Sequence, residues 1–398
     1  MALSALAAAA PPRAAPTAPG EARFRFAVVD GLDGLDALQG EWEGLAGRSG
    51  RPEQGFQAFA WLRAWAAHYA GDGGGLRIVA GHFGGRLALV WPLALRRRAG
   101  VAILGFMGEP LCQYHDALVD DAAAEAGILC AALAQLGRLG CDLVSLRRVR
   151  DDARLAPCLI GAGATPTRSE RAPYIDFAAS PDAAAFEASL SGKGRADRRR
   201  RLRQLAAQGE LRRQAESRPE PMRELIGQAM DFKRQWAVNA GQFAPAVFDA
   251  RFWRCLRDAA ARPGPDAMLR VFALRCGDQL AGVEISYAYK RRLFGHVLAP
   301  NPAFAKFGAG NALADAAIQD AYAQGYAAYD LLAPADPYKA AWTKASVGVT
   351  DYALALNWRG ALYARLALGF GRRAASLAPP ALARLALRRM AARAQALD

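Results

Sequence analysis

The sequence has few of the residues that build metal sites and disulfide frameworks. It contains only six cysteines and four histidines in 398 residues, and no cysteine pair has CxxC spacing. Scattered cysteines of this kind are typical of reduced thiols rather than of a disulfide-rich secreted domain or a zinc site. We therefore expect no metal, and a cytoplasmic protein.

Long apolar runs without charges or helix breakers are also missing, apart from an Ala/Pro-rich stretch in residues 1–22. A membrane-spanning helix needs about 18 or more such residues, so none is expected. No Lys or Arg precedes Leu3–Ala10, although the first segment of a signal peptide is positively charged. The stretch is therefore predicted to be a disordered tail.

Acidic residues are fewer than basic ones, and the formal net charge is +14. Such an excess favours an anionic partner, which could be a coenzyme, an acidic glycan, a nucleic acid or a membrane surface. The nucleophile-elbow motif G-x-S-x-G does not occur, which argues against a Ser-His-Asp hydrolase. The length is sufficient for two domains.

The most informative stretch runs from Leu269 to Trp342. It begins with three runs typical of strands, and in the second run apolar and polar residues alternate with the period of a strand that has unlike faces. These runs are Leu269–Cys276, Leu280–Tyr289 and Leu293–Leu298. A glycine-containing loop then leads into a helix. Such a loop exposes backbone N–H groups at the positive end of the helix dipole, where a pyrophosphate can bind.

After this helix the pattern predicts a strand, a short helix and a last strand, at Ala327–Leu332, Pro337–Thr343 and Thr350–Leu356. The order of elements resembles the N-acetyltransferase (GNAT) superfamily. The sequences YDLL at 329–332 and YKAAW at 338–342 resemble the CelD-type group, which is related to the Fem aminoacyltransferases. The resemblance covers residues 23–359. It implies an acyl-coenzyme A (acetyl-CoA) donor, held by Lys306, Phe307, Gly308, Ala309, Gly310 and Asn311 and by Val297 and Leu298 on the preceding strand.

The first half of the chain repeats this order of elements. The expected fold class is therefore α/β (mixed α+β), with two tandem GNAT-like units, each a mixed, largely antiparallel sheet flanked by helices. Only the second unit is expected to bind coenzyme, because the first has acids at Asp120–Asp121 where they would repel a pyrophosphate. The expected segments are the 1–22 tail, the 23–178 N-terminal unit, the 179–210 basic connecting helices, the 211–360 C-terminal unit and the 361–398 basic amphipathic tail.

Acyl transfer to an amine or hydroxyl requires a base for the acceptor and an acid for the leaving thiolate. The resemblance places His296 on the strand beside the pantetheine arm, and a histidine there suits a base near neutrality. Glu284, on the polar side of the neighbouring strand, is the rival base. Tyr338 begins the short helix near the expected position of the coenzyme sulfur, and is the predicted acid.

A basic run precedes the second unit, and Arg198, Arg199 and Arg201 are its predicted contacts with an anionic acceptor. The alternative is a solvated helix that packs through its leucines. Aromatic residues do not interleave with the run, which argues against single-stranded nucleic acid. Asp116, Asp330 and Lys339 are expected to line the substrate site. The basic C-terminal tail could lie on anionic lipid as a peripheral membrane contact, or dock on the protein.

The favoured function is transfer of an acyl group from acyl-CoA to an amine or hydroxyl of a polar acceptor, with an envelope or exopolysaccharide precursor as the acceptor suggested by the resemblance. One alternative is a Fem-like transferase that uses aminoacyl-tRNA, although a long coiled-coil arm is absent from the sequence. The other is a non-catalytic binding protein in polysaccharide biosynthesis.

Overall fold

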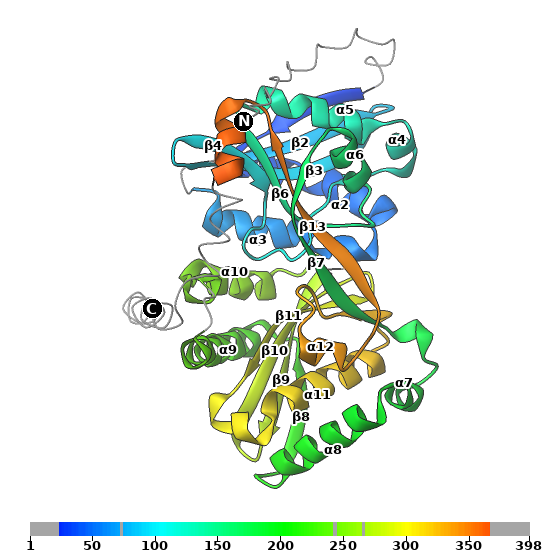
Figure 1. Cartoon of the computed structure of the whole chain (residues 1–398), viewed down its shortest axis with the longest axis vertical. Helices are drawn as coiled ribbons and strands as arrows, with labels where there is room; N and C mark the ends of the chain where they lie inside the picture. Colours follow the sequence, from blue (N-terminus) through cyan, green and yellow to red (C-terminus); the bar gives the residue numbers. More distant parts are fainter. Residues whose placement is uncertain (1–23, 72–74, 242–244, 265–266, 367–398) are drawn as a thin grey trace, which may run out of the picture.

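The structure is a computed structural model that describes residues 24–71, 75–241, 245–264 and 267–366. It has two lobes joined by one continuous sheet (Figure 1). The predicted tail 1–22 and nearly all of the predicted tail 361–398 lie outside the described residues. Every helix within the described ranges is too short or too polar to span a bilayer.

The first lobe is a sheet covered by helices on both faces. Its strands are β1 (Phe24–Val29), β2 (Gly75–Phe83), β3 (Arg86–Arg98), β4 (Val101–Phe106), the two-residue β5 (Leu118–Val119) and β6 (Leu143–Arg150). Its helices are α1 (Gly31–Ala37), α2 (Gln39–Ser49), α3 (Phe59–Tyr69), α4 (Asp121–Glu125), α5 (Ile128–Gln135) and α6 (Leu155–Gly161). On β2, Ile78 and Val79 belong to different core clusters, because successive strand residues point to opposite faces.

The second lobe has the same layered arrangement. Its strands are β8 (Leu211–Glu216), β9 (Ala267–Cys276), β10 (Gln279–Tyr289), β11 (Arg292–Pro300) and β12 (Ala328–Asp330). Helices α9 (Pro219–Ala240) and α10 (Ala250–Ala261) cover one face, while α8 (Gly192–Ala206) and α11 (Ala309–Ala323) cover the other. The short helices α7 (Ala183–Ser189) and α12 (Pro337–Ala340) flank α11.

Two long strands, β7 (Thr165–Asp176) and β13 (Ser346–Ala355), cross between the lobes (Figure 1). The strand order is β1-β2-β3-β4-β6-β13-β7-β12-β11-β10-β9-β8. Parallel ladders in the described residues occur only between β4 and β6 and between β11 and β12, so the sheet is mixed and largely antiparallel. The expected fold class is confirmed. The last strand, however, was expected in the 211–360 unit, whereas β13 pairs with β6 and β7 of the preceding chain.

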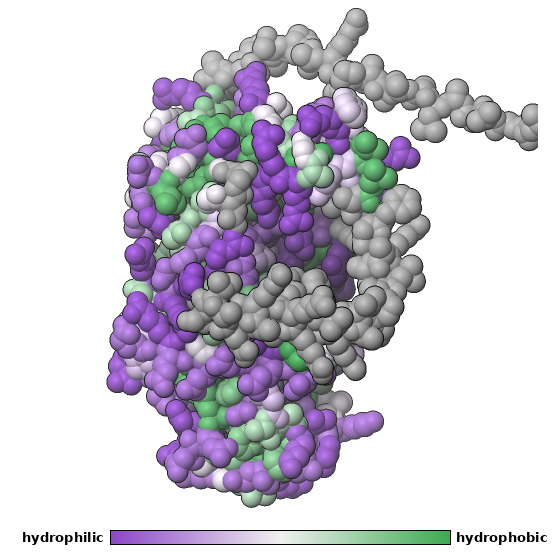
Figure 2. Space-filling model, turned by 90° about the vertical axis from the view of Figure 1, so that its left-hand side faces the viewer, coloured by the Kyte–Doolittle hydropathy of each residue, from purple (hydrophilic) through white to green (hydrophobic). Residues whose placement is uncertain are grey.

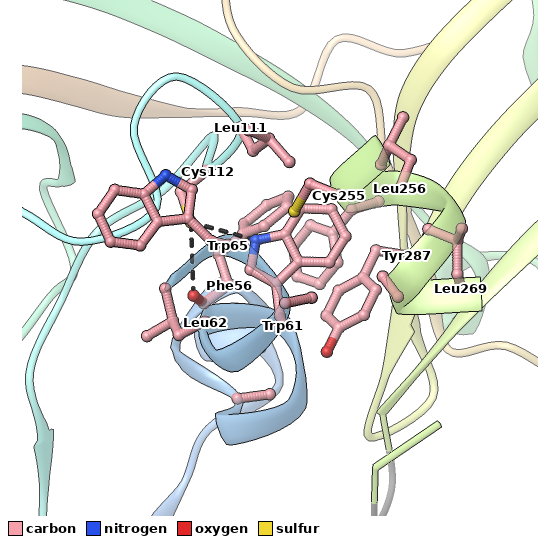
Figure 3. Packing of buried hydrophobic residues seen from close by; sticks show 14 of the residues in the cluster. Phe56, Trp61, Leu62, Trp65, Leu111, Cys112, Cys255, Leu256, Leu269 and Tyr287 are labelled. Carbon is pink, nitrogen blue, oxygen red and sulfur yellow. Dashed lines mark hydrogen bonds between the residues drawn. The ribbon is translucent and has the colours of Figure 1, made fainter. Parts of the chain in front are cut away.

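The lobes also share a hydrophobic core. Trp61 and Phe56 of the first lobe pack on Tyr287 of β10, with ring centroids 4.5 and 6.0 Å away. The Trp61 indole N–H donates to the Cys112 sulfur at 3.2 Å, and this thiol in turn lies 3.6 Å from the Phe56 carbonyl (Figure 3). Fully burying each large apolar side chain contributes about 1.5–3 kcal/mol. The interface therefore holds the lobes together as one folded unit.

A pocket between the two lobes

The pairing of β11 changes in its middle. It pairs with β12 through three residues only, and the last pair is Phe294 with Asp330. Along β10, Ile285 is opposite Val297 and Ser286 is opposite Gly295, so His296 is an additional residue on β11. Such a β-bulge bends a strand and re-aims its side chains. It places His296 and Val297 together at the border between the lobes.

A pocket of about 600 Å³ lies at this border, within the usual size range of small-molecule sites. The first lobe supplies a loop and the end of β6, and the second supplies α9, α10 and the bulge of β11. The lining residues are Glu109, Pro110, Cys112, Gln113, His115, Arg147, Arg148, Lys233, Ala246, Val247, Asp249, Phe252, Trp253, His296 and Val297. Figure 2 shows the side of the molecule formed by α9 and α10, where hydrophilic residues predominate at the level between the lobes.

His296, the predicted base, lines this pocket, but its ring lies among aromatic rings. The centroids of Trp61, Phe252 and Phe56 are 5.5, 5.8 and 6.0 Å away. Both of its ring nitrogens are buried, without a hydrogen-bond partner among the described residues. Burial, with a smaller contribution from Arg148, lowers the pKa of His296 to about 3. The imidazole is therefore neutral at pH 7, as a base must be, but it is a weak one.

Glu284, the rival base, lies on the opposite face of β10 from the pocket. It is 1% exposed and accepts hydrogen bonds from the hydroxyls of Ser286 and Tyr329, the latter at 2.8 Å. Burial raises the pKa of this carboxyl. Tyr329 reaches it across Gly295, where a Cβ atom would lie 2.8 Å from the tyrosine oxygen. The structure therefore does not bring Glu284 and His296 together.

Tyr338, the predicted acid, is the second residue of α12 and is 42% exposed. Burial of part of the ring, together with Asp336, raises the pKa of Tyr338 to about 12. The phenol therefore carries its proton at neutral pH. It does not belong to the residues that line the inter-lobe pocket.

The predicted pyrophosphate loop is the end of a 3₁₀ helix, Pro302–Phe307, followed by the first turn of α11. Gly308 has φ 78°, a left-handed conformation that glycine adopts readily. The predicted acceptor residue Arg201 covers it, because a Cβ atom on Gly308 would lie 3.1 Å from the Arg201 side chain. The structure thus brings the loop and the basic helix α8 together, on the face opposite α9 and α10.

The three predicted arginines of α8 differ in their surroundings. Arg198 pairs with the buried Asp315 at 2.5 Å, and its guanidinium lies 4.4 Å from the Trp342 ring centre. Arg201 pairs with Asp197 at 2.7 Å, whereas Arg199 is exposed. The charge of Arg198 is therefore already balanced within the fold, and this residue holds α8 on α11.

Asp330, predicted to line the substrate site, has 0% exposure. It accepts hydrogen bonds from the Tyr114 hydroxyl at 2.6 Å, from Arg292 at 2.9 Å and from Arg150 at 3.4 Å. The Leu332 N–H also donates to it at 3.0 Å. Tyr114 and Arg150 belong to the first lobe, so Asp330 acts as a clamp between the lobes.

The other two predicted lining residues are also held by neighbours. The Lys339 ammonium donates to the carbonyls of Leu332 and Pro334, both at 2.9 Å, and burial lowers its pKa. Asp116 accepts from the Gln54 amide at 2.8 Å, and burial raises the pKa of this carboxyl to about 6. Neither residue is part of the lining of the inter-lobe pocket.

His115 is a pocket residue that the sequence analysis missed. Its Nδ1 lies 2.8 Å from the Arg147 carbonyl oxygen, and because a carbonyl only accepts, Nδ1 carries the proton. The ring stacks on Phe106 with centroids 4.6 Å apart. Burial lowers the pKa of His115 to about 4, so the ring is neutral. Its Nε2 is buried and has no partner among the described residues, which leaves a fixed, unprotonated nitrogen at the pocket.

The signal for His115 was present in the sequence, at Tyr114-His115-Asp116. The segment is extended and forms a β-bridge from His115 to Val149. Successive side chains of an extended chain point to opposite sides. Tyr114 points to the buried Asp330 and Asp116 to Gln54, so the middle residue is the one that reaches the pocket.

Comparison with known proteins identifies the second lobe. Residues 192–340 match the model of the acetyltransferase (GNAT) domain family. No curated protein matches the sequence. The fold is similar to that of FemX, with a TM-score of 0.59 and 11% identity over 82% of this chain and 98% of that structure.

Two further solved structures have a similar fold. L-PGS from Bacillus licheniformis has a TM-score of 0.51 and 12% identity over 89% of this chain and 97% of that one. The C-terminal domain of a putative lysylphosphatidylglycerol synthetase from Agrobacterium fabrum has a TM-score of 0.50 and 12% identity over 83% and 94%. At such identities these likenesses concern the fold alone. Residues 192–340 form a GNAT domain, and the protein is an acyltransferase of the GNAT type.

Proposed function

We propose that this acyltransferase uses acyl-CoA as donor and transfers the acyl group to an amine or hydroxyl of a polar acceptor that binds in the inter-lobe pocket. The observation that carries the proposal is the position of the pocket. Its wall contains the bulge of β11 at His296 and Val297, immediately beyond the point where β11 and β12 separate. A donor bound along β11 would present its thioester to an acceptor in the pocket.

In the proposed reaction the acceptor nitrogen or oxygen attacks the thioester carbon, and the carbon–sulfur bond breaks. The acceptor loses a proton and the thiolate gains one. His115 is the best-placed proton acceptor, because its ring lines the pocket and the Nδ1 hydrogen bond fixes Nε2 with a free lone pair. Its lowered pKa makes it a weak base, as it does His296, so the fixed ring is what favours His115. Tyr338 remains the proposed proton donor. Lys306–Asn311 would hold the pyrophosphate of the donor.

For the acceptor we propose an envelope or exopolysaccharide precursor. The pocket lining contains five charged side chains and two histidines, which suit a hydrophilic molecule better than a lipid chain. Both the acceptor class and the donor can be tested with the full-length protein.

The test is a calorimetric titration with acetyl-CoA, coenzyme A and bulk tRNA, combined with a thiol-release assay against amino sugars, amino acids and sugar nucleotides. We expect acetyl-CoA to bind and thiol to be released only with an acceptor. Binding of tRNA instead would support an aminoacyl-tRNA donor. An absence of both binding and release would favour a non-catalytic protein.

A glycine substitution tests the donor loop. A Cβ atom on Gly310 meets nothing closer than Pro300 at 3.5 Å, so Gly310→Val should leave the fold intact while obstructing the approach of a pyrophosphate to the backbone. The matched control is Gly137→Val, which places the same side chain in open space. Unchanged coenzyme affinity in Gly310→Val would place the donor elsewhere.

A further inference from the structure

The charges around the inter-lobe pocket do not balance. Its two acids already have partners: Glu109 pairs with Arg96 at 2.9 Å and lies 3.7 Å from Arg147, while Asp249 pairs with Arg251 at 2.9 Å. Arg96 and Arg251 lie outside the pocket lining. Neither acid is therefore left to neutralise the remaining cations of the pocket.

Two of those cations have no carboxylate partner among the described residues. The Nη1 atom of Arg148 is buried and makes no hydrogen bond there. Lys233 lies with its ammonium 4.4 Å from the ring centre of Trp236, but no carboxylate of the described chain pairs with it. A second ammonium, that of Lys339, is close enough to repel it. Partly buried cations without an ion-pair partner are costly unless a ligand compensates them. Glu170 and Asp351 compensate Arg148 only in part, because burial still lowers the pKa of its guanidinium.

The backbone conformation of Arg148 also indicates that this residue has a functional role. Its φ of 55° is a left-handed conformation that costs about 1 kcal/mol or more in a residue other than glycine. This geometry is held by the Arg148 N–H, which donates to Asp351 at 2.8 Å, and by the carbonyl, which accepts from the His115 N–H at 3.1 Å. The strained residue thus lies directly beside the proposed proton acceptor.

We propose that Arg148 and Lys233 together bind an anionic group of the acceptor, a carboxylate or a phosphate. The inference rests on the proposed function for the assignment to the acceptor, whereas the anion site itself rests on the unpaired cations. Arg148 comes from β6 of the first lobe and Lys233 from α9 of the second, so the anion would bridge the lobes. The acceptor class is therefore an amine or hydroxyl compound that carries a negative charge.

The experiment is calorimetry on the full-length protein with inorganic pyrophosphate and with succinate, at constant ionic strength. The variants are Arg148→Gln and Lys233→Met, both of which keep most of the side-chain volume. The control is Arg98→Gln, which removes an exposed charge at the end of β3. Because hydrogen bonds to charged groups are strong, we expect each pocket variant to lose about 10- to 100-fold in affinity for the preferred anion, and the control to lose none.

The anion whose binding the two pocket variants lose identifies the group, since a loss for pyrophosphate indicates a phosphate and a loss for succinate a carboxylate. Pyrophosphate binding that both variants keep belongs to the proposed donor loop. Failure of both anions to bind the wild-type protein, or an equal loss in Arg98→Gln, would overturn the anion site. Acetyl-CoA is titrated into the same variants. A parallel loss of its affinity would assign the cations to the donor and overturn the assignment to the acceptor. A wild-type protein that binds the anion but not acetyl-CoA would refute the proposed function and leave the anion site standing.

Discussion

Two groups of charged residues lie between the lobes, and they differ in how their charges are paired. Around Asp330 every charge has a partner: the carboxylate accepts from Arg150, Arg292, Tyr114 and a backbone N–H, and it has no exposed surface. In the pocket, and within the part of the chain that the structure describes, Arg148 has a buried nitrogen without a hydrogen-bond partner and Lys233 contacts the Trp236 ring but no carboxylate.

This difference distinguishes charged residues that hold the lobes together from charged residues that are available to bind a ligand. A saturated network stabilises one arrangement of the lobes and has no capacity for a ligand. Unsatisfied groups cost stability, and such groups at a pocket therefore indicate a molecule that completes them. The following experiments test the distinction, from the largest expected effect to the smallest.

The largest expected effect is on activity. His115→Asn keeps a donor for the Arg147 carbonyl but removes the free ring nitrogen, so kcat for thiol release should fall by about 10²–10⁴-fold, with little change in coenzyme affinity. His82→Asn, on the other side of the first lobe, is the control. A full rate in His115→Asn together with a loss in His296→Ala would restore His296 as the base.

Removing the charge of Asp330 should cost the most stability. In Asp330→Asn, Arg150 and Arg292 lose the negative charge that compensates them in a buried position, which costs about 3–5 kcal/mol. Asp278→Asn removes one partner of an exposed pair with Arg212, where the cost should be below about 1 kcal/mol. Urea denaturation measures both. Equal costs would mean that the Asp330 network is no clamp.

Glu284, with its partners Ser286 and Tyr329, is intermediate between the saturated Asp330 network and the unpaired pocket cations. One of its carboxylate oxygens is hydrogen-bonded, and the other has no partner among the described residues. Gly295→Ala would place a methyl group 2.8 Å from the Tyr329 oxygen and should cost about 1–3 kcal/mol. Adding Tyr329→Phe removes the closest atom, so the double variant should lose less than the sum of the two single ones. Additive losses in denaturation experiments would contradict this coupling.

The smallest expected effect is the pH dependence of anion binding. Burial and the neighbouring Lys339 lower the pKa of Lys233 to about 8. Lys233 is therefore charged below this pH and neutral above it, so anion affinity should fall by up to about tenfold between pH 7 and pH 9. His115 and His296, with pKa values of about 4 and 3, do not titrate there. Lys233→Met should abolish the dependence, and its persistence in that variant would exclude Lys233.

Much of the fold could be predicted from the sequence, because hydrophobic periodicity is a local signal. The alternation in β10 and the glycine loop before α11 both led to the correct elements. The pairing of β13 could not be predicted in this way, since it joins residues about 200 positions apart, for example Thr350 and Val149, and strand order leaves no local pattern.

The candidate site could be predicted only in part. His296 was chosen because the resemblance places its strand beside the pantetheine arm, and it does line the pocket. Asp330 and Lys339 were chosen from a resemblance. Tyr114 and Arg150, which bind Asp330, lie on segments distant in sequence, so its burial could not be foreseen. Lys339 is held by the nearby carbonyls of Leu332 and Pro334. Arg148 and Lys233 are two among 51 basic residues. What distinguishes them is a position at the pocket without an ion-pair partner among the described residues, and this is a property of the assembled lobes.

The pairing of β13 with β6 and β7 has a consequence for the growing chain during translation. The first lobe lacks the strand between β6 and β7 until residues 346–355 have been synthesised. Until then, facing edges of β6 and β7 expose backbone N–H and C=O groups that could pair with another chain. A ribosome-bound fragment that ends before β13 should therefore be protease-sensitive and prone to aggregate, and the amino-terminal half becomes resistant only when nearly the whole protein has emerged.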